Sequence, residues 1–286
     1  APIRRANIPK HDPVEQLCTS KWNQGSPYND SCPMYFNLGR SITGCVATAM
    51  AQILYYHRSK MVTETQAEIP AYQGRKETNG QHLQVQAVPA NSPIDWDNMT
   101  DTYGSSSTAK QKKAVADLMW YCGASVQMDY TNSSSGAYSS DVDDAFKNYF
   151  GFGESVKYNY ASNFTEEQWD AMIYNEVANA RPVYLSGAND SGGHAFVCDG
   201  YDGNLCYHIN WGWGGSSDGY FLLAGLNPSE QGLGGSDGGY SQGRECVIGI
   251  EPVNFGTRAM PFENANLKRI CTTAFDKDGD GVLTYG

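Results

Sequence analysis

The spacing of apolar residues changes near residue 182, and this change limits the chain to few architectures. Before it, helical spacing recurs in residues 45–58, 108–122 and 139–150, and in a stretch that Thr165 opens. After Pro182, short apolar runs alternate with Gly, Asp and Asn, which is typical of antiparallel strands. A helix-rich part followed by a strand-rich part predicts an α+β protein with two packed lobes.

The expected sheet is built from short runs separated by turn residues. The runs are residues 183–185, 194–198, 205–210, 220–223 and 246–250. We therefore expect a helical N-terminal lobe to about residue 181 and an antiparallel sheet lobe from about residue 182. Together they would form one domain over residues 1–252, followed by a linker and an acidic tail over residues 253–286.

Charge and hydropathy exclude two classes of partner. Lys and Arg number 20 against 31 Asp and Glu, a net charge of −11 that repels phosphates and anionic lipid. No apolar run approaches the roughly 18 residues that cross a bilayer, because Thr48 and Gln52 interrupt the best candidate. We expect a soluble monomer that binds neither nucleic acid nor membrane.

The eight cysteines form no Cys-x-x-Cys motif, so neither a zinc ribbon nor a thioredoxin-like motif is supported. Cys198 and Cys206 are predicted to face each other across a hairpin that turns at Asp202 and Gly203. A disulfide and two buried thiols are both open there. If Cys45 is free, seven cysteines remain, and at least one more is unpaired within the chain.

Cys45 and His194 have the surroundings of a nucleophile and its base. Cys45 follows Gly44 at the expected start of a helix, where the helix dipole and free N–H groups stabilise a thiolate. A thiolate also needs a general base. His194 follows Gly192 and Gly193 at the start of a strand, which gives close backbone approach and a rigid mount.

Three further residues complete a candidate acyl-transfer site. Asn210 could orient the His194 ring, and the Trp211 indole could shield it from water. Gln24, 21 residues before Cys45, could share an oxyanion hole with the Cys45 backbone N–H. The order Cys, His, Asn, with separations of 149 and 16 residues, is typical of papain-like enzymes.

Each residue also has an ordinary structural interpretation. An isolated cysteine in a helix of small residues is more often a buried apolar group than a nucleophile. Gln24 alone would be an exposed loop amide, and Trp211 and Trp213 could be core rings. The occurrence of all these residues in one order favours catalysis.

These motifs resemble the streptopain family of bacterial papain-like cysteine peptidases, from about Val14 to Pro252. The matching segments are Trp22-Asn23-Gln24, Thr43-Gly44-Cys45-Val46-Ala47, Gly192-Gly193-His194-Ala195-Phe196 and His208-Ile209-Asn210-Trp211-Gly212-Trp213. The resemblance implies a papain-like two-lobed fold with the active-site cleft between the lobes. It implies Cys45 as nucleophile, His194 as base and Gln24 as oxyanion donor. By the same resemblance, Asn210 is the orienting amide and Trp211 its cover.

The resemblance also implies a biological setting and a specificity. The enzyme would be secreted by a bacterium as an inactive precursor whose N-terminal prodomain is removed, so that the chain from Ala1 is the mature form. It would cleave protein and peptide substrates broadly, favour an apolar residue next but one before the cut, and need no cofactor. The expected substrate-binding residues are Ser135, Gly136, Tyr138, Ala188 and Gly193.

Two segments depart from a papain-like pattern. The signature Cys-Gly-Ser/Ala-Cys-Trp/Tyr of eukaryotic papain enzymes is absent around Cys45, which limits the resemblance to the bacterial branch. The tail carries Asp276, Asp278 and Asp280 at positions 1, 3 and 5 of a loop like that of an EF-hand. These acids could hold Ca²⁺, or form a frayed acidic tail from a truncated module, because the acid usual at position 12 is missing.

The favoured function is therefore a cysteine endopeptidase that acts through a thioester. Two alternatives remain open on the sequence. One is an extracellular protein-binding module that uses its aromatic residues and acidic tail. The other is a papain-like acyltransferase or amidase, which keeps the nucleophile but changes the acceptor or the substrate.

Overall fold

In the computed structural model, which describes residues 8–232, 238–252 and 271–272, helices dominate the first half and strands the second. The described α-helices are α1 (Cys45–Tyr56), α2 (Ala109–Ser125), α3 (Val142–Tyr149) and α4 (Glu166–Ala178). The strands are β1 (Tyr72–Thr78), β2 (Gln81–Val85), β3 (Lys157–Tyr160), β4 (Val183–Asn189), β5 (Gly192–Tyr201), β6 (Tyr207–Asn210), β7 (Gly219–Phe221) and β8 (Gln242–Ile248). Short 3-10 turns are Arg58–Lys60, Trp96–Asn98, Ser139–Asp141 and Ala161–Asn163.

The main sheet has six strands in the order β3-β8-β4-β5-β6-β7, and every pair is antiparallel. In its centre, Gly187 of β4 lies opposite His194 of β5, and Ser186 lies opposite Ala195. On the other side of β4, Ser186 pairs with Glu245 of β8. The predicted antiparallel sheet is thus present, and its central strands carry residues of the candidate site.

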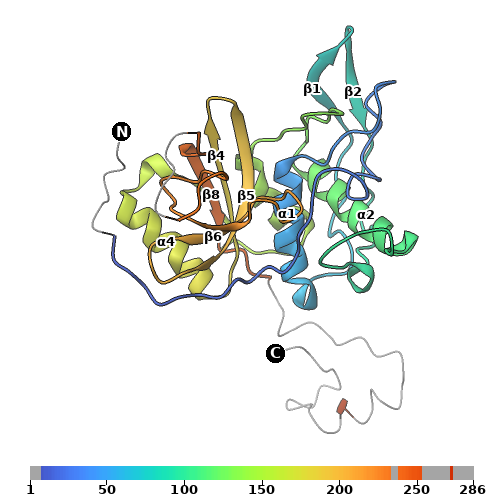
Figure 1. Cartoon of the computed structure of the whole chain (residues 1–286). Coiled ribbons are helices and arrows are strands. Elements are labelled where there is room, and N and C mark those ends of the chain that lie inside the picture. The colour runs from blue at the N-terminus through green and yellow to red at the C-terminus, as the bar shows by residue number, and fades with distance from the viewer. Residues whose placement is uncertain (1–7, 233–237, 253–270, 273–286) are drawn as a thin grey trace.

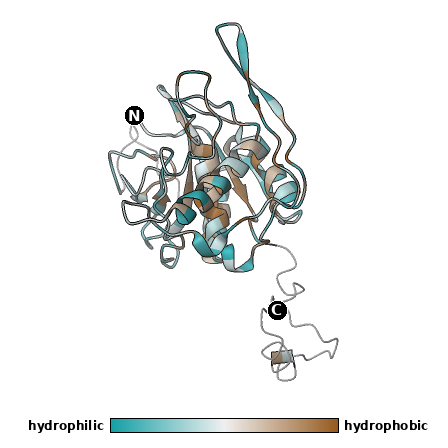
Figure 2. Cartoon of the chain, turned by 90° about the vertical axis from the view of Figure 1, so that its right-hand side faces the viewer, coloured by the Kyte–Doolittle hydropathy of each residue, from teal (hydrophilic) through white to brown (hydrophobic). Residues whose placement is uncertain are grey.

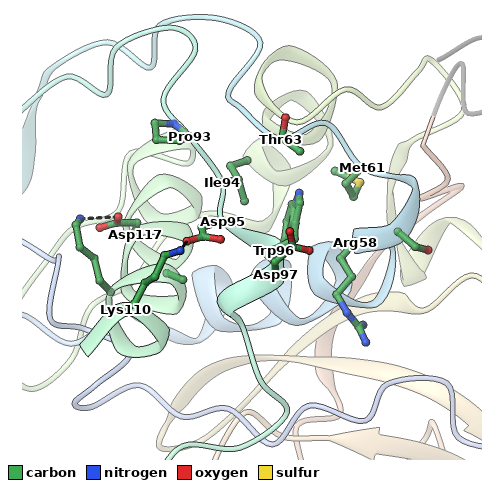
Figure 3. A pocket seen from close by; sticks show the side chains of 13 residues that line it. Arg58, Met61, Thr63, Pro93, Ile94, Asp95, Trp96, Asp97, Lys110 and Asp117 are labelled. Carbon is green, nitrogen blue, oxygen red and sulfur yellow. Dashed lines mark hydrogen bonds and ion pairs between the residues drawn. The ribbon is translucent and has the colours of Figure 1, made fainter. Parts of the chain in front are cut away.

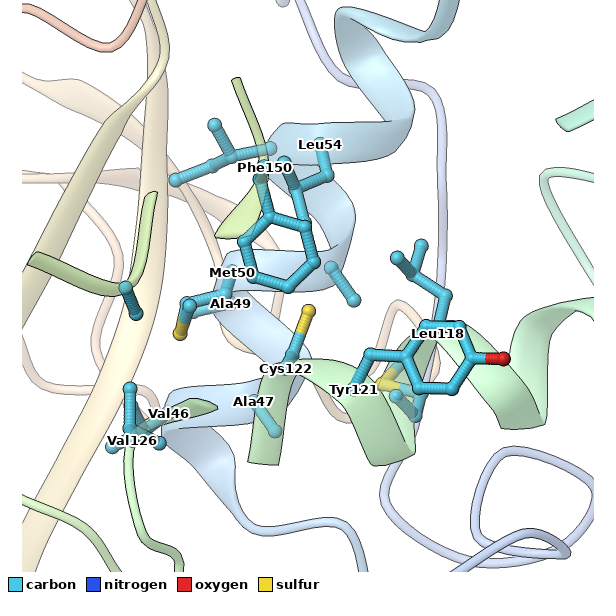
Figure 4. Close-up of a cluster of buried hydrophobic side chains, with 14 of the residues drawn as sticks. Val46, Ala47, Ala49, Met50, Leu54, Leu118, Tyr121, Cys122, Val126 and Phe150 are labelled. Atoms are coloured by element: carbon cyan, nitrogen blue, oxygen red, sulfur yellow. The ribbon is translucent and has the colours of Figure 1, made fainter. Parts of the chain in front are cut away.

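Helix α1 lies between the sheet and α2 (Figure 1). Small side chains in its first turns let it approach both neighbours, and every residue from Val46 to Tyr55 is buried. Figure 4 shows Met50 and Leu54 of this helix packed with Leu118 and Cys122 of α2. Cys45, the half-buried first residue of this buried helix, is therefore held on a rigid element.

Helix α4 packs on the sheet, although the sequence analysis places it in the helical part before residue 182. Trp169, Ile173 and Val177 recur every fourth residue, so they form one apolar face. That face belongs to the same core as Leu185 and Phe196 of the central strands. Because β3 also joins the sheet, the second lobe begins before residue 157. Helical spacing reveals an apolar face but not the surface that covers it.

The strands β1 and β2 form a hairpin that the sequence analysis did not identify. Asn79 and Gly80, both with positive φ, make its two-residue turn, which suits the twist of paired strands. Figure 2 shows this hydrophilic hairpin standing out from the body of the molecule. Its base is fastened where the Tyr72 hydroxyl donates to the Met128 carbonyl at 2.7 Å.

An N-terminal segment, residues 12–23, runs across both lobes (dark blue in Figure 1). Val14 pairs with Tyr201 at the end of β5, and the Cys18 N–H donates to the Asp199 carboxylate at 2.7 Å. At its other end, Trp22 is buried in the core of the helical lobe and its carbonyl accepts from the Gly214 N–H. The segment therefore ties the sheet lobe to the helical lobe.

All eight cysteines are free thiols in the structure. Cys198 lies opposite Ile209, so the predicted juxtaposition with Cys206 is wrong. The hairpin loop is longer than a two-residue turn at Asp202 and Gly203, and the register shifts between Cys198 and Gly200. Both effects move Cys206 away from the position opposite Cys198.

Membrane-spanning helices and metal-binding clusters are both absent from the described residues. No helix among them is both long and apolar enough to cross a membrane. They contain no cluster of three or more His, Cys, Asp or Glu side chains arranged to hold a metal ion. The predicted calcium ligands Asp276, Asp278 and Asp280 lie outside the described residues.

Candidate active site

Cys45 occupies the first position of α1, and Gly44 precedes it as the N-cap residue. No side chain caps this end, so the N–H groups of the first turn are not occupied by a capping side chain. Gly44 has φ of 84°, and a Cβ built on it would lie 2.7 Å from the Met128 Sδ. Only glycine suits this backbone, and it lets the chain turn sharply into the helix just before the sulfur.

His194 lies near the start of β5 and is 8% exposed. Its Nε2 is 2.9 Å from the backbone carbonyl oxygen of Trp211. A carbonyl oxygen can only accept a hydrogen bond, so Nε2 carries a hydrogen. The other ring nitrogen, Nδ1, is therefore the one that can take a proton from a nucleophile.

Cys45 and His194 line one cavity of about 490 Å³ between the helical part and the sheet. Cys45 comes from α1 and His194 from β5, which pack against each other. The Cys45 sulfur is also hydrogen-bonded by the backbone of Ala195, the residue after His194. The structure thus brings together the two residues that the sequence places 149 positions apart.

Burial favours the uncharged forms of both side chains. It raises the pKa of the Cys45 thiol and lowers the pKa of the His194 imidazole to about 4. Backbone N–H groups of Ala195, Val46 and Cys45 oppose the shift at the sulfur, and the Trp211 carbonyl opposes it at the ring. Charge can therefore develop on the sulfur when its proton passes to His194, because the two opposite charges then stabilise each other.

Four aromatic rings lie around His194, among them Phe196 at 5.9 Å, and the nearest is not the predicted one. Trp213 stacks on the imidazole with ring centroids 4.7 Å apart, while Trp211 is parallel to it at 6.1 Å. Tyr240 lies at 5.3 Å from a third side. Trp213, interpreted from sequence as a possible core ring, therefore lies closer to the imidazole than Trp211, whose covering role stays a prediction. The only sequence signal for Trp213 is its place in Trp-Gly-Trp, two residues after Trp211.

The side-chain hydrogen bonds of Asn210 go to residues other than His194, so any orienting effect on the ring is indirect. Its side chain instead exchanges hydrogen bonds with the Gln52 amide at 3.0 Å and donates to the Ser20 carbonyl at 2.7 Å. Its oxygen also accepts from the Gly212 N–H at 3.0 Å. Asn210 thereby fixes the backbone on either side of Trp211, whose carbonyl holds the imidazole.

Gln52 is a positioning residue that the sequence analysis missed. It lies seven residues after Cys45 in α1, two turns away on the same face. Its fully buried amide bonds Asn210 and also accepts from the Ser20 hydroxyl at 3.1 Å. A lone amide in an otherwise apolar helical run was the available signal.

Gln24 lies beside the start of α1 but does not line the cavity. Its carbonyl accepts from the Thr43 N–H at 3.1 Å, two residues before Cys45. The side chain is half-buried. The contacts therefore place the Gln24 backbone near the nucleophile and leave its oxyanion role a prediction.

All five predicted substrate-binding residues line the cavity of Cys45 and His194. They are Ser135, Gly136, Tyr138, Ala188 and Gly193. Other lining residues, Tyr160, Ser186 and Glu245, were not predicted from the sequence. The walls are therefore the loop before α3 on one side and strands β4, β5 and β8 on the other.

A larger cavity of about 730 Å³ lies elsewhere, between the end of α1 and α2 (Figure 3). It is lined by charged residues of both signs, including Arg58, Asp97 and Lys110. No cysteine or histidine lines it. Size alone would therefore select the wrong site, and the chemistry of the lining residues selects the smaller cavity.

The sequence of the chain is similar to a known family and to curated proteins. Residues 22–221 match the model of the Peptidase C10 family. Streptopain of Streptococcus pyogenes is 40% identical over 260 residues, which cover 85% of this chain and 64% of streptopain. The thiol protease/hemagglutinin PrtT of Porphyromonas gingivalis is 36% identical over 254 residues, covering 89% of this chain and 28% of PrtT. The chain thus spans less than two thirds of the curated relatives that it matches.

Solved structures give the same result for the fold. The active wild-type interpain A cysteine protease of Prevotella intermedia has a TM-score of 0.74 and 32% identity, covering 85% of this chain and 99% of that one. A prointerpain A fragment from the same organism has a TM-score of 0.69 and covers 85% and 76% of the two chains. The matched region contains Cys45, His194 and the residues that position them. This chain belongs to the Peptidase C10 family.

Proposed function

We propose that this chain is a cysteine endopeptidase that hydrolyses peptide bonds through a Cys45 thioester. The observation that carries the proposal is the shared cavity of Cys45 and His194, with the Trp211 carbonyl bonded to Nε2 and Nδ1 left as the proton acceptor. Membership of a peptidase family supports it. The larger cavity described above has neither a cysteine nor a histidine in its lining.

The reaction follows from the positions of these groups. Nδ1 of His194 takes the thiol proton, and the sulfur attacks the peptide carbonyl carbon to give a tetrahedral oxyanion. The imidazolium then protonates the leaving amine, and the C–N bond breaks to leave a thioester on Cys45. Water, deprotonated by His194, attacks the thioester, releases the carboxylic acid and restores the thiol.

The oxyanion needs donors in place before it forms. The backbone N–H of Cys45 at the start of α1 supplies one donor, aided by the positive end of the helix dipole. We assign the second to the Gln24 side-chain amide, because the Gln24 backbone is bonded to Thr43 at the entrance to the helix. Losing such a donor costs roughly a hundredfold to a thousandfold in rate.

The substrate class and setting rest on the family and on the cavity lining. We expect protein and peptide substrates, cleaved broadly, with an apolar residue next but one before the cut. Small residues such as Gly187 and Ala188 leave room for such a side chain beside the nucleophile. The relatives are bacterial, and one of the solved relatives is a fragment of a proenzyme, prointerpain A. Both facts support secretion as a precursor with a removable prodomain.

Replacing Cys45 by alanine tests the proposal. We expect the Cys45→Ala variant to lose peptide hydrolysis by at least about a thousandfold, because no other group supplies the nucleophile. Hydrolysis of a fluorogenic peptide and thermal unfolding would be measured together. Cys271→Ala removes a thiol that does not line the cavity and serves as the matched control.

The products separate the proposal from its rivals. Hydrolysis adds the mass of one water to the two fragments, whereas an acyltransferase joins one fragment to a new amine. Full activity in the folded Cys45→Ala variant would refute the mechanism. A wild-type protein that neither cleaves peptides nor shows one fast-reacting thiol would indicate a binding module instead.

A further inference from the structure

Two walls enclose the catalytic cavity, and side-chain hydrogen bonds join them. The loop wall consists of residues 134–140, and the sheet wall is formed by strands β4, β5 and β8. The hydroxyl oxygen of Ser139, in the loop wall, lies 2.8 Å from that of Ser186 and 3.0 Å from that of Tyr184, both in β4. Ser139 therefore fastens the loop wall to the sheet wall.

On the sheet wall the network ends at the carboxylate of Glu245 in β8. The Ser186 hydroxyl donates to one of its oxygens at 2.7 Å, and the Tyr158 hydroxyl donates to the other at 2.6 Å. Burial and this carboxylate raise the pKa of Tyr158, which therefore keeps its proton. None of the ion pairs among the described residues includes Glu245, so its carboxylate is oriented by hydroxyl donors.

The carboxylate fixes the direction of each hydrogen bond in this network. A carboxylate only accepts, so the single hydroxyl hydrogen of Ser186 lies toward Glu245. The Ser186 oxygen must then accept, and the hydrogen between the two serines comes from Ser139. The Ser139 oxygen accepts in turn from the Tyr184 hydroxyl. Each hydroxyl thus donates to the next one toward Glu245, and hydrogen bonds in such a chain strengthen one another.

The network is buried and lies beside the base. Ser139 and Ser186 are 8% and 7% exposed, and Tyr184 is fully buried. A buried hydroxyl that loses its partner is costly, because bulk water cannot replace the bond. Gly187, the residue after Ser186, lies opposite His194 in the sheet. The loop wall is therefore fastened at the level of the reacting groups.

We propose that Glu245, acting through Ser186 and Ser139, is a positioning residue that fixes the width of the catalytic cavity. This inference rests on the proposed function and deepens it, because the width limits the size of the apolar side chain next but one before the cut. That side chain is expected beside Gly187 and Ala188, which follow Ser186 in β4. Without the network the loop wall is free to move away from the sheet wall, and a bulkier side chain then fits.

Two peptides that differ in size at that position test the inference. One carries valine and the other carries phenylalanine, and the quantity measured is the ratio of kcat/KM for the phenylalanine peptide to that for the valine peptide. Ser139→Ala should raise this ratio about three- to tenfold, the range that corresponds to the net contribution of one hydrogen bond. Thermal unfolding is measured on the same samples.

Glu245→Gln tests whether the carboxylate acts through Ser139, and it preserves the size of the side chain. The amide has one acceptor oxygen, so it cannot accept from both Ser186 and Tyr158. This variant should also raise the ratio, and the double variant with Ser139→Ala should raise it no further than the larger single effect. A double variant that multiplies the two single effects would show independent actions and overturn the inference.

Alkylation of Cys45 by iodoacetamide separates the width of the cavity from its chemistry. The hydrogen-bond network includes neither Cys45 nor His194, so the alkylation rate at a fixed pH should stay that of the wild type. An alkylation rate that falls as far as kcat/KM in Ser139→Ala would place the effect on the reacting pair and overturn the inference.

A matched control removes a hydroxyl next to the loop wall. Ser133 is exposed and does not line the cavity, and Ser133→Ala should change the ratio less than about twofold. A ratio that neither Ser139→Ala nor Glu245→Gln changes overturns the inference, as does an equal change in Ser133→Ala. If the wild type cleaves neither peptide nor any protein, the proposed function itself fails.

Discussion

The imidazole of His194 is held by a main-chain carbonyl, which a change of side chain cannot delete. The bond to the Trp211 carbonyl persists as long as the backbone after β6 keeps its course. That course depends on Asn210, which bonds the backbone at Ser20 and Gly212, and on its partner Gln52. The orientation of the base is therefore controlled by side chains that do not touch it.

Asn210→Ala should destabilise the protein and lower kcat without removing a direct contact to the base. The free energy of unfolding should fall by about 1–3 kcal/mol, because the buried Gln52 amide loses a partner. Gln52→Ala should have an effect of similar size, and the double variant should fall short of the sum. Urea denaturation and steady-state kinetics measure these effects. Strictly additive losses would show that the two amides act separately.

Trp213→Leu should raise the pKa of His194. Burial holds this pKa at about 4, below its usual value near 6.5, and loss of the stacked indole admits water. In the Cys45→Ala background, an NMR titration of the ring should show a rise of about one pH unit or more. Trp120→Leu, a change of a half-buried indole in α2, is the control. An unshifted His194 would mean that Trp213 does not govern its solvation.

At this scale the sequence located the two residues that share the cavity, Cys45 and His194, better than the residues around them. Gly44 before Cys45 and the two glycines before His194 are local signals that can be read from the sequence alone. Whether the His194 ring is bonded by the Asn210 side chain or by the Trp211 carbonyl depends on where β6 ends. The local sequence pattern does not specify that end. Glu245 gave no signal, because its position in the cavity depends on a strand partner 59 residues away at Ser186.

Among the elements, α1 depends most on a single residue at its boundary. Gly44→Ala forces a backbone with φ of 84° on a residue with a side chain, and its Cβ would lie 3.0 Å from the Ser135 carbonyl oxygen. The expected loss is about 1–3 kcal/mol of unfolding free energy, with a fall in kcat/KM as the Cys45 N–H moves. Gly104→Ala, where nothing lies within 4 Å, is the control for denaturation and kinetics. Equal behaviour of both variants would contradict the prediction.

Helices and strands were predicted correctly from the sequence where a local residue pattern determines them. The Thr165 cap and the apolar face of α4 are both present as expected, since capping and helical spacing are local. The sequence analysis placed α4 with the helical lobe, whereas its apolar face packs on the sheet. An apolar face can pack on any complementary surface, so its spacing does not identify the partner. The strand β3 was missed, since its four residues are half-exposed or exposed and gain their order from pairing with β8.

The whole molecule buries two histidines in the neutral form, and this makes its stability sensitive to acid. The pKa values of His57 and His194 are both about 4, lowered by burial. Between pH 6.5 and 4 the unfolded chain therefore binds more protons than the folded one, so stability falls as pH falls. Each histidine contributes about 3 kcal/mol to this fall.

His57→Gln should reduce the fall in unfolding free energy between pH 6.5 and 4 by about half, because one of the two buried histidines is removed. His57 lies at the end of α1, remote from the base, and its Nε2 has no hydrogen-bond partner. The free energy of unfolding would be measured by urea denaturation at several pH values between 7 and 4. The wild-type and variant curves should converge or cross as the pH falls. Parallel curves would assign the acid sensitivity to other groups.

The N-terminal segment has a consequence for how substrates are admitted. It is bonded at Asp199 and Tyr201 in one lobe and buried at Trp22 in the other, so the lobes cannot swing apart without breaking these contacts. Substrates should then be selected in a groove of constant width, without a closing motion of the lobes that favours one peptide over another. Catalytic turnover should accordingly be insensitive to solvent viscosity, and differences among substrates should arise from side-chain fit alone.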